Sequence, residues 1–337
     1  MTGRLVLAIA VVALVPSVVL ATARSGGQRP HPRDLSALPS YVTRIEPAIV
    51  GLKVRARHDA TSSARLGVHR FASAVVFDPR GYAVTVSYAL MDALEIEAVR
   101  RDGKTFEARL AGFDLDAGLG VVKLEGTGWT AAALGQSRDV AEGTLTGTVG
   151  VDEDGDLVHV VGAVRSVRRF SASWEYMLER AFIVAPASPS WGGSALVNDR
   201  GELIGIGSLR LGDKPFANLF IPLERFLPVK DELIEKGRVH SRAPRPWLGL
   251  YTSADHEGIT IDGFSPVGPA SHAGFRRGDR IKSVNGVNVR SQEEFYEALW
   301  KSRAGEVIQV SVQRADQVMM IPVQSVDRHR VLTGGPR

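Results

Sequence analysis

A long series of short apolar runs between residues 38 and 233 most constrains what this chain can fold into. The runs are rich in valine, isoleucine and leucine, and they are separated by turn sequences such as Asp78-Pro79-Arg80-Gly81. Many β-strands at this spacing are typical of barrels or of a sandwich, so we expect a mainly β fold. The predicted strands are Ile49–Val54, Ala74–Phe77, Ala83–Val86, Ile96–Val99, Leu119–Leu124, Leu145–Val149, Leu157–Val164, Ala181–Val184, Ser194–Val197, Leu203–Gly207 and Asn218–Ile221.

Two segments after these strands differ from them in composition. Residues 222–236 predict a helix that ends at Gly237, because glycine favours the position that follows a helix. Residues 238–246 then contain three arginines and two prolines, which indicates a linker. The region from residue 38 to residue 237 is therefore expected to form one domain.

Residues 247–326 have the pattern of a small α+β domain. Ser291-Gln292-Glu293-Glu294 has the spacing of a capping box, which predicts that a helix begins there. Phe295 and Leu299 then stand one turn apart on the buried face of that helix. The tail at residues 327–337 is predicted to be disordered.

The N-terminus has the order of features found in secretory signal peptides. Arg4 supplies a positive start, residues 5–20 are mostly apolar, and Ala21-Thr22-Ala23 offers small residues at a cleavage position. We therefore expect a signal peptide at residues 1–23, a flexible arm at residues 24–37, and a periplasmic or secreted protein. An uncleaved membrane anchor at the N-terminus is the alternative.

Composition excludes several classes of site. A net charge of +4 with scattered basic residues argues against nucleic-acid binding. The absence of cysteine excludes disulfides, thiolate nucleophiles and cysteine-ligated zinc. Residues 152–156 are acidic but lack the terminal glutamate of a calcium loop, so we interpret them as a solvated hairpin tip. No cofactor and no metal are predicted.

Three short segments of the β-rich region have an order and a spacing that identify a family. Residues 72–90 contain Val86-Ser87-Tyr88, residues 112–124 contain Asp116-Ala117-Gly118, and residues 188–198 contain Trp191-Gly192-Gly193-Ser194. Together with their flanking strands, these segments resemble the three catalytic segments of HtrA/Deg-type serine proteases. The resemblance implies a trypsin-like double β-barrel over residues 38–237.

The position of each catalytic residue in that family holds a different residue here. Tyr88 stands in place of the histidine, Gly118 in place of the aspartate and Gly192 in place of the serine. A serine nucleophile needs a base that a buried acid orients, and a phenol with a pKa of about 10 stays protonated at neutral pH. The resemblance therefore implies a protease fold without protease chemistry. Trp191 is also expected to obstruct the specificity pocket.

One alternative keeps a nucleophile. The segment 182–188 is about two residues shorter than in the family pattern. If the missing residues lie after the nucleophile position, Ser194 takes that position, and the protein is an active endopeptidase with an unconventional base. The histidines of this domain are His58, His69 and His159. A lone histidine is usually an ordinary surface or core residue, so none of them is assigned a catalytic role.

The last domain opens on Leu248, Gly249 and Leu250, and the segment 267–289 follows with Gly-Asp and Asn-Gly turns. This pattern resembles a bacterial PDZ domain. The resemblance implies that backbone N–H groups of the opening loop hold the carboxylate of a peptide C-terminus, while the peptide adds as a strand beside the helix. Phe295 and Leu299 are expected to place apolar surface near that groove. The alternative is a PDZ domain that acts only as a spacer.

These resemblances predict an exported pseudoprotease that binds without cleaving. Its expected ligands are protein C-termini, unfolded segments or an active protease relative. The family resemblance also implies a homo-trimer, with Tyr41 as a candidate assembly aromatic. No nucleic-acid partner is expected, and no membrane contact beyond the signal peptide or anchor. An active endopeptidase that uses Ser194 is the alternative function.

Overall fold

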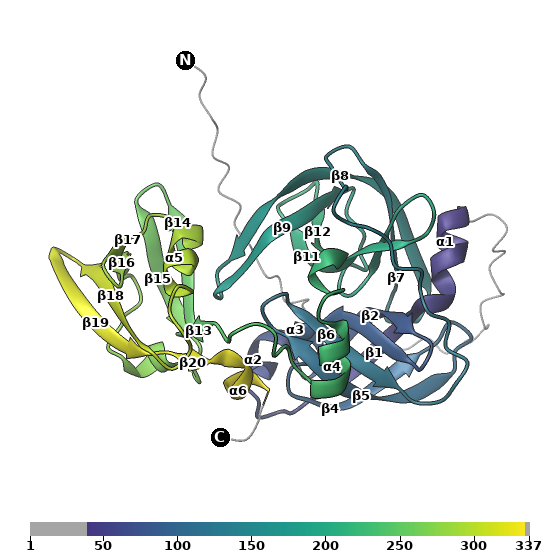
Figure 1. Cartoon of the computed structure of the whole chain (residues 1–337), viewed down its shortest axis with the longest axis horizontal. Helices are drawn as coiled ribbons and strands as arrows, with labels where there is room; N and C mark the ends of the chain where they lie inside the picture. The colour runs from purple at the N-terminus through teal and green to yellow at the C-terminus, as the bar shows by residue number, and fades with distance from the viewer. Residues whose placement is uncertain (1–38, 334–337) are drawn as a thin grey trace, which may run out of the picture.

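Residues 39–333 are described by a computed structural model, which contains two β-barrels and a smaller C-terminal domain (Figure 1). The barrels lie side by side, and the C-terminal domain lies to one side of them. The predicted mainly β class, a double β-barrel followed by a small α+β domain, is confirmed. The predicted signal peptide at residues 1–23 and the arm at residues 24–37 lie outside the described residues.

The first barrel contains β1 (Ile49–Ala56), β2 (His69–Asp78), β3 (Tyr82–Val86), β4 (Ala93–Val99), β5 (Thr105–Asp114) and β6 (Leu119–Leu124). These antiparallel strands close in the order β1-β2-β3-β6-β5-β4. Val84 of β3 lies opposite Val121 of β6, and both side chains are fully buried. β5 is not among the predicted strands, because the exposed Glu107 and Arg109 interrupt its apolar residues.

The second barrel contains β7 (Leu145–Val151), β8 (Leu157–Ala172), β9 (Tyr176–Ala185), β10 (Ala195–Val197), β11 (Leu203–Leu211) and β12 (Ala217–Pro222). Its strands close in the order β10-β11-β12-β9-β8-β7. β8 and β9 are longer than predicted, and they pair as far as Ala172 and Tyr176. The extra length forms a hairpin that reaches from the barrel toward the C-terminal domain (Figure 1).

Short helices accompany the barrels: α1 (Ser40–Ile45), η2 (Glu46–Ala48), α2 (Ser63–Leu66), α3 (Ser87–Leu90), η3 (Leu223–Arg225) and α4 (Lys230–Lys236). The single helix predicted over residues 222–236 is wrong, because η3 and α4 are separate. Pro228 lies between them, lacks an N–H group and disfavours helical geometry at the residue before it. Gly237, with φ +72°, ends α4 as predicted. No helix within residues 39–333 has the length and apolar character needed to cross a bilayer.

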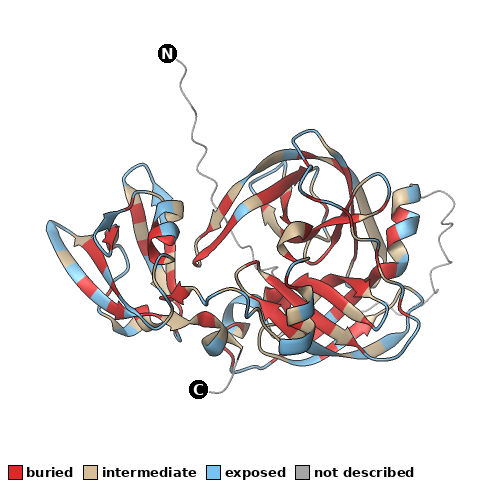
Figure 2. Cartoon of the chain, in the orientation of Figure 1, coloured by how far each residue is buried: buried red, intermediate tan, exposed pale blue. Residues whose placement is uncertain are grey.

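The two barrels share an apolar core. Phe77 of β2 meets Phe226, which follows η3, edge to face with ring centroids 4.8 Å apart. Phe226 is fully buried. Buried residues follow the inward faces of the strands, whereas exposed residues gather at the turns (Figure 2). Removal of this apolar surface from water is the main driving force that holds the barrels together.

The C-terminal domain contains β13 (Pro246–Trp247), β14 (Leu250–Asp255), β15 (Gly258–Phe264), η4 (Pro269–His272), β16 (Arg280–Val284), β17 (Val287–Asn288), α5 (Gln292–Leu299), β18 (Val307–Arg314), β19 (Gln317–Gln324), β20 (Val326–Asp327) and α6 (Arg328–Leu332). Its main sheet has the order β14-β15-β16-β18-β19. The predicted start of α5 is confirmed, because the Ser291 hydroxyl accepts a hydrogen bond from the Glu294 N–H at 3.1 Å.

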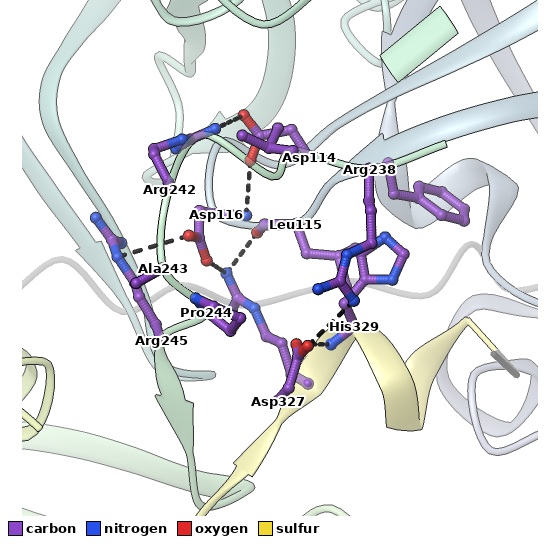
Figure 3. Close-up of a pocket in the computed structure, with 13 residues that line it drawn as sticks. Asp114, Leu115, Asp116, Arg238, Arg242, Ala243, Pro244, Arg245, Asp327 and His329 are labelled. Atoms are coloured by element: carbon purple, nitrogen blue, oxygen red, sulfur yellow. Dashed lines mark hydrogen bonds and ion pairs between the residues drawn. The ribbon is translucent and has the colours of Figure 1, made fainter. Parts of the chain in front are cut away.

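Charged contacts hold the predicted linker against the first barrel. Arg242 pairs with Asp114, and Arg245 lies 3.7 Å from Asp116 (Figure 3). β13 pairs with β20, so the start and the end of the C-terminal domain lie side by side. The segment 238–246 therefore connects the two domains, while Arg242 and Arg245 bind the barrel and Arg238 pairs with Asp327.

The predicted disorder of the tail is wrong for residues 327–333. This part of the chain forms α6, and its first residue, Arg328, is only 9% exposed. The Arg328 guanidinium pairs with Asp116 at 2.8 Å and donates a hydrogen bond to the Leu115 carbonyl at 2.6 Å. A tertiary contact thus orders a segment whose composition alone indicates disorder.

The role of Arg328 predicts a large loss of stability in Arg328→Leu. The substitution removes the donor to the Leu115 and Glu175 carbonyls and leaves Asp116 with only the more distant Arg245, which costs about 3 kcal/mol in the free energy of unfolding. Urea denaturation followed by fluorescence measures this loss. Arg330→Leu is the matched control, because Arg330 is exposed on the same helix and should change stability by less than about 0.5 kcal/mol. Equal midpoints for the two variants would contradict the assignment.

Candidate functional site

The three positions that replace the predicted catalytic residues lie together between the barrels. Tyr88 lies on α3, directly after β3, and the preceding Ser87 donates its N–H to the Gly118 carbonyl at 2.9 Å. The Tyr88 hydroxyl donates to the Ser208 carbonyl at 2.8 Å. Burial raises the pKa of the Tyr88 phenol well above its ordinary value of 10.0. The phenol therefore stays protonated and cannot act as a general base at neutral pH.

Gly192 faces this phenol directly. A Cβ atom at Gly192 would lie 2.9 Å from the Tyr88 hydroxyl oxygen, which is closer than side chains normally approach one another. The Gly192 carbonyl accepts a hydrogen bond from the Ser73 N–H at 2.8 Å, which fixes the backbone at this point. The tyrosine therefore occupies the space that a residue with a side chain would need at position 192.

Gly118 has a second tyrosine as its neighbour. Its φ of +78° disfavours any residue that has a side chain. A Cβ atom there would lie 3.0 Å from the hydroxyl oxygen of Tyr176, and that hydroxyl donates to the Ala117 carbonyl at 2.9 Å. An aspartate at position 118 would be strained in its backbone and crowded by Tyr176.

Two backbone N–H groups on either side of Gly192 bond to acceptors of the protein itself. The Ser190 N–H donates to the Ser188 hydroxyl at 3.3 Å, and the Gly193 N–H donates to the Gly207 carbonyl at 2.8 Å. An oxyanion hole needs N–H groups directed at the developing charge. The N–H groups of Ser190 and Gly193 therefore point at the Ser188 hydroxyl and the Gly207 carbonyl.

Trp191 forms part of an aromatic and cationic stack. The Arg210 guanidinium lies 4.9 Å from the Trp191 ring centroid and 4.4 Å from that of Phe216. Both distances are in the range of cation–π attraction. The Trp191 indole therefore lies in the segment before β10 and is held by Arg210 of β11.

Ser194, the alternative nucleophile, is enclosed. Its exposed fraction is 0%, and its hydroxyl donates to the Trp191 carbonyl at 2.9 Å. Across residues 39–333, no histidine side chain hydrogen bonds to Ser194. The Ser194 hydroxyl is therefore buried and bonded to the protein's own backbone.

The loop at the start of the C-terminal domain binds a carboxylate. The Leu248 N–H donates to Glu175 at 3.0 Å, and the Leu250 N–H donates to the other carboxylate oxygen of Glu175 at 2.7 Å. Gly249, between the two donors, has φ +80°, and a Cβ atom there would lie 2.6 Å from the Gly268 Cα. Only glycine allows the loop to take this form, in which the N–H groups of Leu248 and Leu250 point at one carboxylate.

Glu175 is the site residue that sequence reasoning missed. It lies between β8 and β9 at the hairpin tip, is 1% exposed and has a positive φ of 55°. No local signal distinguishes it from other glutamates in turns, because its partners lie more than seventy residues away along the chain. The two other predicted groove residues, Phe295 and Leu299, are fully buried in the core of the C-terminal domain.

Burial dominates the electrostatics of Glu175. It raises the pKa of this carboxyl to about 7, while the N–H groups of Leu248 and Leu250 and the charge of Arg328 act in the opposite direction. The Arg328 guanidinium also donates to the backbone carbonyl of Glu175 at 3.0 Å. No group of three or more His, Asp and Glu residues within the described part of the chain is placed to hold a metal ion.

Comparisons with known proteins agree with this geometry. A trypsin-like peptidase domain model matches residues 72–206, and a PDZ domain model matches residues 246–324. Serine endoprotease DegS of Escherichia coli K12 is 30% identical over 299 residues, which cover 84% of this chain and 83% of that protein. The chain belongs to the DegS/HtrA family.

Other members of the DegS/HtrA family match over similar lengths. Serine endoprotease DegS of Haemophilus influenzae is 26% identical over 302 residues, which cover 86% of this chain and 87% of that protein. Two solved structures share the fold, each with a TM-score of 0.54. The HtrA-type protease AlgW with decapeptide is 22% identical and covers 85% of this chain and 97% of its own. The serine endoprotease from Yersinia pestis is 24% identical and covers 88% of this chain and 99% of its own.

The raised pKa of Glu175 predicts how stability depends on pH. The folded protein retains the Glu175 proton up to about pH 7, whereas the unfolded chain releases it near the ordinary value of 4.5. The stabilising contribution is therefore full below pH 4.5 and is lost as the pH rises toward 7. The melting temperature of the wild type relative to Glu175→Gln should fall by about a few degrees between pH 5 and pH 8.

Differential scanning calorimetry at matched ionic strength measures this difference. Glu179→Gln is the matched control, because Glu179 lies on β9 of the same hairpin but its side chain is 54% exposed. Its melting temperature should follow that of the wild type at every pH. A constant difference between wild type and Glu175→Gln would show that the carboxyl does not titrate in this range.

Proposed function

We propose that this DegS/HtrA-family chain is an exported pseudoprotease that binds peptide segments or a protease partner without cleaving them. The observation that carries the proposal is the packing of the Tyr88 hydroxyl into the space beside Gly192. A nucleophile, a base and an orienting acid are all required for serine protease chemistry. The site supplies none of them at Tyr88, Gly118 or Gly192, and two tyrosines fill the vacated space.

Peptide binding by the C-terminal domain is supported by the shape of its opening loop. Two backbone N–H groups, those of Leu248 and Leu250, point at one carboxylate in this structure. The carboxylate of a peptide C-terminus has the same charge and the same two acceptor oxygens as the side chain that now lies there. Protein C-termini and unfolded segments with free C-terminal ends are therefore the ligand class that the site fits.

Export and assembly rest on other grounds. The signal-peptide pattern at residues 1–23 supports a periplasmic or secreted location. A homo-trimer is proposed from the family resemblance alone. The Tyr41 ring lies over Gly147 of its own β7, where a Cβ atom would come within 2.1 Å of it. This tyrosine packs on its own barrel, and its role as an assembly aromatic is likewise proposed from the family resemblance.

The proposed absence of catalysis predicts that serine-directed fluorophosphonates do not label the protein and that casein stays intact. Gly192→Ser should also remain unlabelled, because the new side chain meets Tyr88 and has no base to activate it. Gel fluorescence with a fluorophosphonate probe and a casein digest measure both activities. Labelling of the wild type that Ser194→Ala abolishes would overturn the proposal in favour of the active endopeptidase.

Peptide binding has its own prediction. A fluorescein-labelled decapeptide with an apolar last residue and a free carboxylate should bind, and its C-terminal amide should bind at least about tenfold more weakly, which is about 1.4 kcal/mol. Gly249→Val should weaken binding to a similar degree, because a side chain there displaces the loop from Gly268. Fluorescence anisotropy measures the three affinities. Equal binding of acid and amide would exclude the carboxylate site and favour a spacer role for the domain.

A further inference from the structure

The carboxylate loop of the C-terminal domain already holds a ligand from the same chain. The β8–β9 hairpin reaches the domain (Figure 1), and the Glu175 carboxylate at its tip accepts hydrogen bonds from Leu248 and Leu250. A side-chain carboxylate here takes the place that the proposed function gives to a peptide C-terminus. The site is therefore filled before any external peptide arrives.

The hairpin tip also contacts β14 and α5, which form the two sides of the proposed peptide groove beside that loop. The Thr252 N–H of β14 donates to the Ser173 carbonyl at 2.9 Å, which is the kind of backbone contact that an added strand makes. Across the groove, the Tyr296 hydroxyl of α5 donates to the Ala172 carbonyl and accepts from the Glu175 N–H at 3.1 Å. Both walls of the groove thus hold the hairpin backbone.

An apolar side chain of the hairpin completes this arrangement. Met177 lies on β9, yet it is 3% exposed and belongs to the apolar cluster of the C-terminal domain together with Leu248, Leu250 and Phe295. A carboxylate, a backbone contact and a buried apolar side chain are the three features by which a groove of this kind binds an extended peptide. The hairpin supplies all three.

The backbone at the tip is held in an unfavourable form. Glu175 has φ +55°, a region that residues with a side chain rarely adopt. Such a conformation persists only when surrounding contacts hold it, and it is common where a segment changes state. The contacts that hold Glu175 come from the C-terminal domain and from Arg328, so release of these contacts also releases the unfavourable backbone.

We propose that Glu175 is an intramolecular ligand of this carboxylate loop, and that a peptide with a free C-terminus binds only by displacing the β8–β9 hairpin tip. This inference rests on the proposed function, because it assumes that the loop accepts external C-termini. The affinity for an external peptide is then the intrinsic affinity multiplied by the fraction of molecules in which the tip has left the groove. If one molecule in about ten is open, the apparent affinity falls about tenfold.

Glu175→Gln tests the proposal. At pH 8, above the pKa of about 7 of this carboxyl, glutamine keeps the size of the side chain but removes its charge. It also turns an N–H donor toward the loop, where two N–H donors already point. The hairpin tip should therefore leave the groove more often. Hydrogen exchange with residue-level mass spectrometry should show exchange at the Thr252 amide at least about tenfold faster than in the wild type. This amide bonds to Ser173 and not to Glu175, so it reports on the whole tip.

Binding is measured on the same full-length proteins. The probe is a fluorescein-labelled decapeptide that ends in methionine with a free carboxylate, chosen because Met177 already fills the apolar cluster. Glu175→Gln should bind this probe at least about tenfold more tightly than the wild type, about 1.4 kcal/mol. Glu179→Gln, with its exposed side chain on the same hairpin, should match the wild type in both measurements.

The outcomes separate this inference from the proposed function. Unchanged hydrogen exchange at the Thr252 amide in Glu175→Gln would overturn the inference, whatever the affinity for the probe. Faster exchange at Thr252 with a measurable but unchanged affinity for the probe would also overturn it. Faster exchange with no binding by any variant would keep Glu175 as the internal ligand and remove the external C-terminus from the proposed function.

The wild type provides a second test that does not depend on the variant folding. Saturating probe should accelerate exchange at the Glu175 amide, which donates to the Tyr296 hydroxyl while the tip is in place. The probe amide, which lacks the carboxylate, should leave this exchange unchanged at the same concentration. Saturated binding with slow exchange at Glu175 would mean that the peptide binds beside the hairpin, and the proposal would fail.

Discussion

The contacts of one buried arginine join three parts of the chain that are distant in sequence. Arg328 begins α6, and it binds Asp116 and the Leu115 carbonyl in the first barrel as well as the Glu175 carbonyl at the hairpin tip. The linker arginines Arg242 and Arg245 bind Asp114 and Asp116 on the same part of the barrel. The position of the C-terminal domain against the barrels therefore depends on this group of charged contacts. A guanidinium suits the position, since its planar set of donors can serve several oxygens at once.

The positions of Tyr88, Gly118 and Gly192 lie in a closely packed region between the barrels. Each position without a side chain faces a large phenol, Gly192 facing Tyr88 and Gly118 facing Tyr176. Protein interiors tolerate substitutions best when total volume is preserved. Reintroduction of a serine or an aspartate alone would therefore create a clash before it restored a catalytic group, so the two tyrosines and two glycines act as a matched set.

The carboxylate loop and the hairpin tip connect stability with binding. A buried carboxylate is costly unless hydrogen bonds satisfy it, and Glu175 obtains these bonds only when the C-terminal domain lies against the barrels. The same bonds are the ones that an external C-terminus would use. Glu175 and an external C-terminus would therefore compete for the N–H groups of Leu248 and Leu250. This competition links peptide binding to the position of the hairpin.

Local sequence determined much of the fold. Short apolar runs such as Leu119–Leu124 were predictable as strands, because an apolar run and the turn residues that bound it are properties of neighbouring residues. The capping serine Ser291 and the terminating Gly237 were also predictable, since both act on backbone groups within one helical turn. The family resemblance identified Tyr88, Gly118 and Gly192, and the loop at Gly249, from short continuous motifs.

Tertiary structure decided the rest, because the decisive contacts join residues that are far apart in the sequence. The order of α6 depends on Asp116, more than two hundred residues earlier, and no composition rule detects such a partner. β5 was not predicted because its exposed face carries polar residues that interrupt the apolar pattern. Its pairing with β4 and β6 stabilises it as a strand in spite of those residues. The sequence also did not show that Glu175 binds the carboxylate loop. Glu175 is an ordinary glutamate in a turn until folding brings two distant N–H groups to its side chain.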